Sequence, residues 1–230
     1  MNTPALGISF EREIREQPGV WERLADSDKA VALAEALEGD VLLVGSGSSL
    51  FAARVGALAL RRRHIRAEAL AATEARLDHA AYEGRTVVAI SQSGRSSDLL
   101  DALDVLKPVR VIALTNTPDS PLGARADLTI DIDAGSECAV PATKSVTATL
   151  AVLLWAASLL GDATSRDPKA LLWTARTVRR WLAEDADAEL AEPAHRIALR
   201  RHVVLLGSDY GWPIAQEVAL KLKEAAYMHA

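Results

Sequence analysis

Short apolar runs alternate along this chain with longer stretches in which apolar residues recur at helical spacing. The runs are rich in valine, leucine and isoleucine and are bounded by glycine or polar residues, which is typical of strands buried in a parallel sheet. Strands are therefore expected at residues 41–44, 65–70, 86–90, 109–114 and 128–132. Strands that alternate with helices predict an α/β fold, with one parallel sheet covered by helices on both faces.

Helices are expected where apolar residues recur at helical spacing in a stretch bounded by helix-breaking residues. The pattern predicts a short helix over 9–16, which Gln17-Pro18-Gly19 should end, and a second helix over 20–37. The remaining helices are expected at 50–62, 73–79, 143–160 and 169–186, with one more that ends at Leu106. Pro168 stands just before the last of these, a position that proline favours.

The composition narrows the class of protein. Half of the 230 residues are hydrophobic, which excludes an intrinsically disordered chain and provides for a substantial core. The net charge is −5 and there is no long basic run, so we expect no nucleic-acid partner. The most apolar stretch, 145–160, is too short for a membrane span, and the N-terminus has no signal-peptide pattern. The expectation is a soluble cytoplasmic protein that binds no membrane.

Cysteine and histidine show no metal-binding pattern. Cys138 is the single cysteine, so it cannot form an intrachain disulfide or a cysteine-rich metal site. The five histidines lack the spacing of metal ligands. We therefore expect no metal and no cofactor. A small anionic ligand is still compatible with the acidic composition, because backbone dipoles at helix starts can bind it.

An internal repeat links two distant segments. Residues 41–60 and 203–222 align without gaps, with identical residues at 7 of 20 positions, among them Gly45 with Gly207 and Ser46 with Ser208. Glycine and serine shared at the turn favour duplication over chance. We therefore expect N-terminal helices in 1–40, a first domain in 41–195 and the start of a second, incomplete domain in 198–230. The final helix is expected to reach the end of a truncated chain without a cap, and this tail should pack on the first unit, pack on a partner subunit or be loosely held.

Two serine-rich loops, 45–49 and 91–98, follow two of the expected strands. A strand, a Gly/Ser loop and a helix together form a phosphate-binding arrangement, because glycine lets the backbone approach and the free amides at the helix start donate to phosphate oxygens. Both loops fall at the carboxyl edge of the sheet, where ligands of such folds bind. Together, the loops could clamp one phosphate from two sides.

Other interpretations of these loops fit less well. Gly45-Ser46-Gly47 begins a dinucleotide-binding fingerprint, but Leu50 occupies the third glycine position; Glu68, at the distance of a ribose-binding acid, keeps this alternative open. Neither loop matches a nucleophile elbow or a P-loop. The serines could also serve only as helix caps. A second loop of the same kind favours a ligand.

Five segments resemble the sugar isomerase (SIS) domain family. They are 13–18, 45–49, 90–98, 137–144 and 217–224, and they read EIREQP, GSGSS, ISQSGRSSD, ECAVPATK and EVALKLKE. Their order and spacing are similar to those of the isomerase half of glucosamine-6-phosphate synthase and of stand-alone aminosugar-phosphate deaminases and isomerases. The resemblance implies a five-stranded parallel sheet flanked by helices, and a homodimer that takes a hexose 6-phosphate or an aminosugar 6-phosphate.

The resemblance also assigns residues to roles. Glu224 corresponds to the carboxylate that moves a proton between C1 and C2, with Lys221 beside it. Ser91, Gln92, Ser93 and Ser96 correspond to the phosphate ligands, Ser46, Gly47, Ser48 and Ser49 line the sugar and the phosphate, and Val140 and Ala142 approach the sugar. From spacing alone, Glu224 would instead be a solvated surface charge.

Two departures from the family leave the function open. Ala142 replaces a usual serine, and the ring-opening histidine and the lysine tail of the family lie downstream of Ala230. Complete catalysis by this chain alone is therefore not expected. The sequence leaves two functions: an isomerase or deaminase of aminosugar 6-phosphates, or a regulatory module that binds a phosphosugar without turnover.

Overall fold

The computed structural model describes residues 7–161 and 167–230. Its strands are β1 (Val41–Gly45), β2 (Ala67–Ala71), β3 (Thr86–Ile90), β4 (Arg110–Thr115) and β5 (Leu128–Asp131). Its helices are α1 (Ile8–Ala25), α2 (Lys29–Ala36), α3 (Ser48–Arg61), α4 (Ala72–Leu77), η1 (His79–Ala81), α5 (Ser97–Leu106), η2 (Gly123–Arg125), α6 (Lys144–Leu159), α7 (Lys169–Glu184), α8 (Ala186–Ala198) and α9 (Gly211–Ala226).

The five strands form one parallel sheet in the order β2-β1-β3-β4-β5. The register places Val41 of β1 between Ala67 of β2 and Thr86 of β3. All five strands lie within two residues of the expected positions. The predicted fold class, a five-stranded parallel α/β sheet, is thus confirmed.

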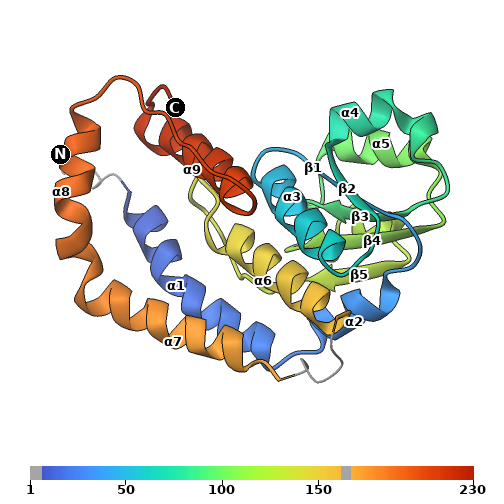
Figure 1. Ribbon diagram of the computed structural model, residues 1–230, viewed down its shortest axis with the longest axis horizontal. Helices are drawn as coiled ribbons and strands as arrows, with labels where there is room; N and C mark the ends of the chain where they lie inside the picture. The colour runs from blue at the N-terminus through green and yellow to red at the C-terminus, as the bar shows by residue number, and fades with distance from the viewer. Residues whose placement is uncertain (1–6, 162–166) are drawn as a thin grey trace.

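Helices cover both faces of this sheet (Figure 1). Along β1, Val41 and Leu43 contribute to the core shared with α1, α2, α3 and α6, whereas Leu42 and Val44 contribute to the core under α4 and α5. This alternation follows from the two-residue period of a strand. Both sets are buried, which is why the strands appear in the sequence as continuous apolar runs.

The prediction that Pro18 ends the first helix is wrong, because α1 continues through it to Ala25. Proline removes one backbone donor, so the carbonyl of Ile14 loses its helical partner. The side-chain amide of Gln17 donates to that carbonyl at 3.1 Å instead. The helix expected over 20–37 is in fact divided before α2, where the Ser27 hydroxyl donates to the carbonyl of Leu24 at 2.7 Å.

The C-terminal part differs most from expectation. Helix α8 was not predicted, and no strand forms at 203–206, where Val204 and Leu206 are 81% and 89% exposed. A strand needs a neighbour for its backbone groups, and the described residues supply only one bridge, between His202 and His229. The last helix also ends before the chain does, since Tyr227 adopts a left-handed φ of 52°.

Helix α9 nevertheless packs on the first unit, as expected of the tail. It lies beside α3 (Figure 1), where the Arg54 guanidinium donates to Gln216 at 2.7 Å and stands 4.8 Å from the ring centre of Trp212. Gly207 also repeats the geometry of Gly45: a Cβ on either would lie under 3 Å from the backbone four residues later. The start of α9 is therefore fixed on the later turns of α3, and its middle lies close to the first serine loop, where Glu217 contacts Ser48.

Candidate functional site

The two serine-rich loops leave the carboxyl ends of β1 and β3, which are neighbours in the sheet. Strand order reverses between these two strands, and the crevice at such a switch point is where ligands of open α/β sheets bind. Helix α3 begins at Ser48 and α5 at Ser97, so the N-termini of both helices lie at this edge. In α3, the Ser49 and Leu50 amides already donate to the carbonyls of Ser46 and Gly47, at 3.2 and 3.0 Å. The two loops that the sequence predicts to form one site thus lie next to each other in the fold.

Glycine shapes the first loop. A Cβ on Gly45 would lie 2.8 Å from the carbonyl carbon of Ser49, and Gly47 adopts a φ of 54° with a ψ of −128°, which side chains disfavour. Ser46 and Gly47 are exposed, whereas Ser48 and Ser49 are half-buried. The loop therefore turns tightly enough to present its backbone and hydroxyl groups at the sheet edge.

The second loop is held by the neighbouring strand. The carbonyl of Gln92 accepts hydrogen bonds from the Asn116 amide at 3.0 Å and from the Thr115 hydroxyl at 3.2 Å. Ser91 is buried, and its Oγ accepts from the Gly94 amide at 3.1 Å. Ser93 is exposed and Ser96 half-buried. Ser91 therefore shapes the turn, while Ser93 presents its hydroxyl to solvent.

Both loops meet the segment before α6 at a small cavity of about 30 Å³. Ser48, Ser49, Gln92 and Ala142, all predicted site residues, line it together with Ser145, Val146 and Thr149. Its volume is that of roughly one water molecule, so a larger ligand would have to lie over it. The other six predicted ligands do not line this cavity: Ser46, Gly47, Ser93 and Val140 are exposed, Ser96 is half-buried and Ser91 is buried.

Three charged residues of α9 form a row above the first loop. Glu217, Lys221 and Glu224 are spaced four and three residues apart and so share one helix face. Lys221 Nζ lies 2.7 Å from Glu224 Oε2 and 3.5 Å from Glu217 Oε1. The Ser48 hydroxyl donates to Glu217 Oε1 at 3.0 Å. The predicted pair Lys221 and Glu224 is thus joined to the predicted serine loop through Glu217.

Glu217 is the residue that the sequence reasoning missed. Its side chain is only 12% exposed, and among the described residues its Oε2 atom has no hydrogen-bond partner. Burial raises the pKa of the Glu217 carboxyl, against the opposing effects of Lys221 and Ser48. A buried carboxylic acid with a raised pKa is suited to proton transfer. Its spacing from Lys221 and Glu224 is the signal in the sequence that could have indicated it.

The segment 137–143 completes the site. Glu137 caps α6: its Oε1 accepts from the Thr143 amide at 2.9 Å and the Ser145 amide at 3.2 Å, and its Oε2 accepts from the Ser145 hydroxyl. Ala142 is half-buried beside the serine loops, whereas Val140 is 87% exposed. This segment therefore presents Val140 to solvent next to the cavity that Ala142 lines.

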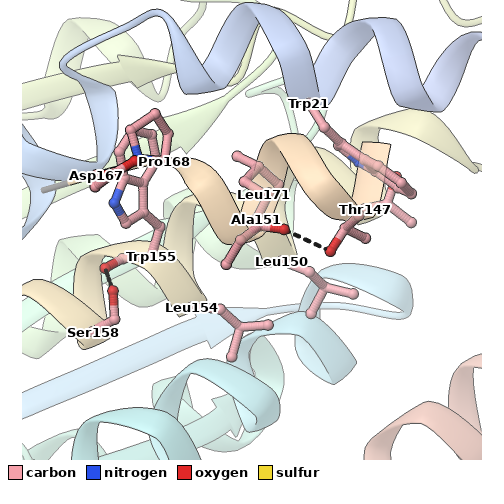
Figure 2. Close-up of a pocket in the computed structure, with 12 residues that line it drawn as sticks. Trp21, Thr147, Leu150, Ala151, Leu154, Trp155, Ser158, Asp167, Pro168 and Leu171 are labelled. Carbon is pink, nitrogen blue, oxygen red and sulfur yellow. Dashed lines mark hydrogen bonds between the residues drawn. The ribbon is translucent and has the colours of Figure 1, made fainter. Parts of the chain in front are cut away.

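A larger pocket lies elsewhere, between α1, α6 and α7 (Figure 2). It has a volume of about 550 Å³ and is mostly apolar, with Trp21, Leu150, Trp155 and Leu171 among its walls. No predicted site residue contributes to the walls formed by the described residues. Thr147, Ser158, Thr174 and Asp167 also line it, but it lies away from both serine loops and from the charged row of α9, so it is not the candidate site.

Within 7–161 and 167–230, no cluster of three or more histidine, cysteine, aspartate or glutamate side chains is arranged to hold a metal ion. Over the same ranges, no helix combines the length and the apolar character needed to cross a bilayer.

The comparison with protein families decides the classification. Residues 37–159, just over half of the chain, match the model of the SIS domain. The chain belongs to the SIS domain family. The family predicted from the serine loops is thereby confirmed, and both loops and Ala142 fall within the matched residues.

Named relatives show which branch of the SIS family this chain is similar to. It is 32% identical, over 248 residues, to the glutamine–fructose-6-phosphate aminotransferase (isomerizing) of Corynebacterium glutamicum, covering 98% of this chain and 40% of that protein. The same enzyme of Gloeobacter violaceus is 32% identical over 95% of the chain and 39% of the relative. The chain thus spans about two fifths of the length of these relatives.

Solved structures agree with this placement. The C-terminal domain of glucosamine-fructose-6-phosphate aminotransferase from Francisella tularensis is 25% identical with a TM-score of 0.79, over 100% of this chain and 70% of that one. A glucosamine-6-phosphate deaminase from Thermotoga maritima has a TM-score of 0.77 over 96% of this chain and 68% of that one; its 24% identity shows the shared fold alone. This SIS domain is therefore related to the isomerase domain of the aminotransferase.

Proposed function

We propose that this SIS domain binds a hexose 6-phosphate or aminosugar 6-phosphate and takes part in its aldose–ketose isomerisation. The observation that carries the proposal is the hydrogen bond from Ser48 to Glu217, which joins the first serine loop to the acid–base row of α9. A phosphate-binding loop and a proton-transfer group are thereby held in one site. The names of the relatives, which act on fructose 6-phosphate, support the same substrate class.

The phosphate would lie over the small cavity between the serine loops. The dipoles of α3 and α5 favour an anion at their N-termini, and Ser93 and Ser96 add hydroxyl donors. Arg95, exposed in the same loop, adds a positive charge. With the phosphate held there, the sugar would extend toward 137–143, where Val140 and Ala142 would contact it.

The acid–base row would then act on the open-chain sugar. Glu224 would remove the proton from C2 of the aldose and return it to C1, while a proton passes from O2 to O1, so that an aldehyde becomes a ketone. Lys221 orients Glu224 by donating to it at 2.7 Å. Glu217, whose pKa is raised by burial, is suited to hold a proton for a sugar oxygen. The homodimer expected from the family stays a prediction.

Calorimetric titration with fructose 6-phosphate tests the proposal. The variant Ser93→Ala/Ser96→Ala should bind at least about tenfold more weakly, because a hydrogen bond to a charged group contributes roughly 1.5–3 kcal/mol. Ser91 is left intact because its buried hydroxyl accepts from the Gly94 amide, whereas Ser93, whose hydroxyl accepts from the Arg95 amide at 3.3 Å, is exposed, so that water can replace it. The control Ser27→Ala alters a hydroxyl at the end of α1 and should bind normally. Equal affinity of the double variant and the wild type would contradict the assignment.

A further inference from the structure

Glu13, in the first turns of α1, is a completely buried carboxylate far in sequence from the residues it binds. Its Oε1 accepts from the Cys138 amide at 2.6 Å, and its Oε2 accepts from the Ala139 amide at 3.2 Å. Its side chain is 0% exposed. The nearest cation, Arg12, is 57% exposed and has its Nη2 atom 3.9 Å from Oε1. The main partners of this buried charge are thus two backbone amides.

Those amides belong to the segment that faces the candidate site. A buried carboxylate is retained only when its oxygens are hydrogen-bonded, and the amides it binds are fixed in turn. Ala139 immediately precedes Val140, and Glu137 fixes the far end of the same segment at Thr143. The segment 137–143 is therefore held at two points: by Glu13, which lies on α1, and by Glu137, which lies in the segment itself.

A second contact ties the same helix to the same region. Glu16, three residues after Glu13, accepts from Lys144, whose side chain is only 4% exposed at the start of α6. Glu13 and Glu16 share one face of α1. Helix α1 thus holds both the segment 137–143 and the helix start that follows it.

We propose that Glu13 is a positioning residue for the sugar-binding side of the site. By holding the Cys138 and Ala139 amides, it fixes the shape of the segment that presents Val140 and Ala142. This inference rests on the proposed function. Within 7–161 and 167–230, the Glu13 carboxylate forms its hydrogen bonds and ion pair with Cys138, Ala139 and Arg12, and none with either serine loop. Its loss should therefore affect the sugar and spare the phosphate.

The variant Glu13→Gln tests this separation. Glutamine has the same shape, but it removes the charge that strengthens the hydrogen bonds from Cys138 and Ala139, and it leaves a single oxygen, at 3.3 Å from the Ala139 amide, to accept from both. We expect about tenfold weaker binding of fructose 6-phosphate, which is close to the loss of one hydrogen bond at 1.4 kcal/mol per tenfold. Binding of inorganic phosphate should stay within twofold of the wild type. The matched control is Glu11→Gln, an exposed glutamate of the same helix that pairs with Arg15.

Hydrogen exchange of the unliganded protein gives a readout that does not depend on the ligand. Glu13→Gln should accelerate amide exchange in 137–141 and leave 91–97 unchanged, and Glu11→Gln should change neither. If Glu13→Gln does not fold, Glu13→Asp retains the charge with a shorter reach and serves for the same measurements.

The outcomes separate this inference from the proposed function. Weaker sugar-phosphate binding with normal phosphate binding and faster exchange in 137–141 supports it. Unchanged exchange in 137–141 overturns it, as does an equal loss of affinity for fructose 6-phosphate and inorganic phosphate. A wild type that binds neither ligand overturns the proposed function and, with it, the sugar-binding role of Glu13, whereas faster exchange would still support the hold on the segment.

Discussion

Gly94 is the residue of the second serine loop whose replacement has the clearest structural consequence. Its φ is 61°, in the left-handed region, and a Cβ built on it would lie 1.9 Å from Ser120 Oγ and 2.5 Å from Ser120 Cβ. Ser120 is itself only 3% exposed, so it has little room to move. Gly94→Ala therefore introduces both backbone strain and a steric clash.

The magnitude follows from these two effects. A non-glycine residue in the left-handed region costs roughly 1–2 kcal/mol, and overpacking of a tight site costs about 1–3 kcal/mol. The free energy of unfolding should thus fall by about 2–5 kcal/mol, and the melting temperature by roughly 4–20 °C, at ~2–4 °C per kcal/mol for a chain of this size. Thermal and urea unfolding followed by circular dichroism measure both quantities.

Two companion variants isolate the clash. Gly84 also has a positive φ, 77°, but a Cβ there would meet nothing within 4 Å. Gly84→Ala should therefore lower the free energy of unfolding only by the backbone strain, about 1–2 kcal/mol. In a Ser120→Gly background, which removes the clashing atoms, Gly94→Ala should cost no more than Gly84→Ala does, which gives a coupling energy of about 1–3 kcal/mol. If Gly84→Ala and Gly94→Ala lowered the free energy of unfolding equally, or if Gly94→Ala showed no coupling to Ser120, the reasoning would be refuted.

Two further predictions concern the acid–base row. The folded-state pKa of Glu217 is raised above its ordinary value of 4.5, so the stability tied to its protonated form is present below that pH and is lost as the pH rises through the folded pKa. The melting temperature of Glu217→Gln minus that of the wild type should therefore increase from pH 4 to pH 8; a constant difference would contradict the burial argument. Glu224→Gln should slow exchange of a C1 proton of fructose 6-phosphate with solvent deuterium by at least about 100-fold, with unchanged affinity, as expected for loss of a general base. A wild type that binds the sugar without any such exchange would favour the binding module.

The sheet and the loop edge could be predicted because they rest on local patterns. Strands buried on both faces appear as unbroken apolar runs, and Gly45 and Gly47 mark a turn that other residues cannot make. Parallel strands then bring the ends of β1 and β3 together without any knowledge of side-chain packing. Both serine loops could therefore be assigned to one edge from the sequence alone.

The errors arose where a compensating side chain or a neighbour distant in sequence decides the outcome. Pro18 remains inside α1 because Gln17 supplies the donor that proline lacks, and breaker rules do not include that compensation. Residues 203–206 resemble β1 in sequence, but the described residues offer them no adjacent strand. A segment with strand character forms a strand only where its backbone groups find a neighbour.

The charged residues of α1 show why the site was only partly visible in the sequence. Glu11, Glu13 and Glu16 are 66%, 0% and 42% exposed, although local composition treats all three alike. Glu13 differs in its place on the helix, since it shares the face of the buried residues Val20 and Leu24, seven and eleven positions later. A carboxylate on the apolar face of a helix requires polar partners from elsewhere in the fold. The position of Glu13 in that pattern therefore indicates that its carboxylate is hydrogen-bonded to a polar group. Only the fold shows that its partners are the backbone amides of the segment beside the serine loops.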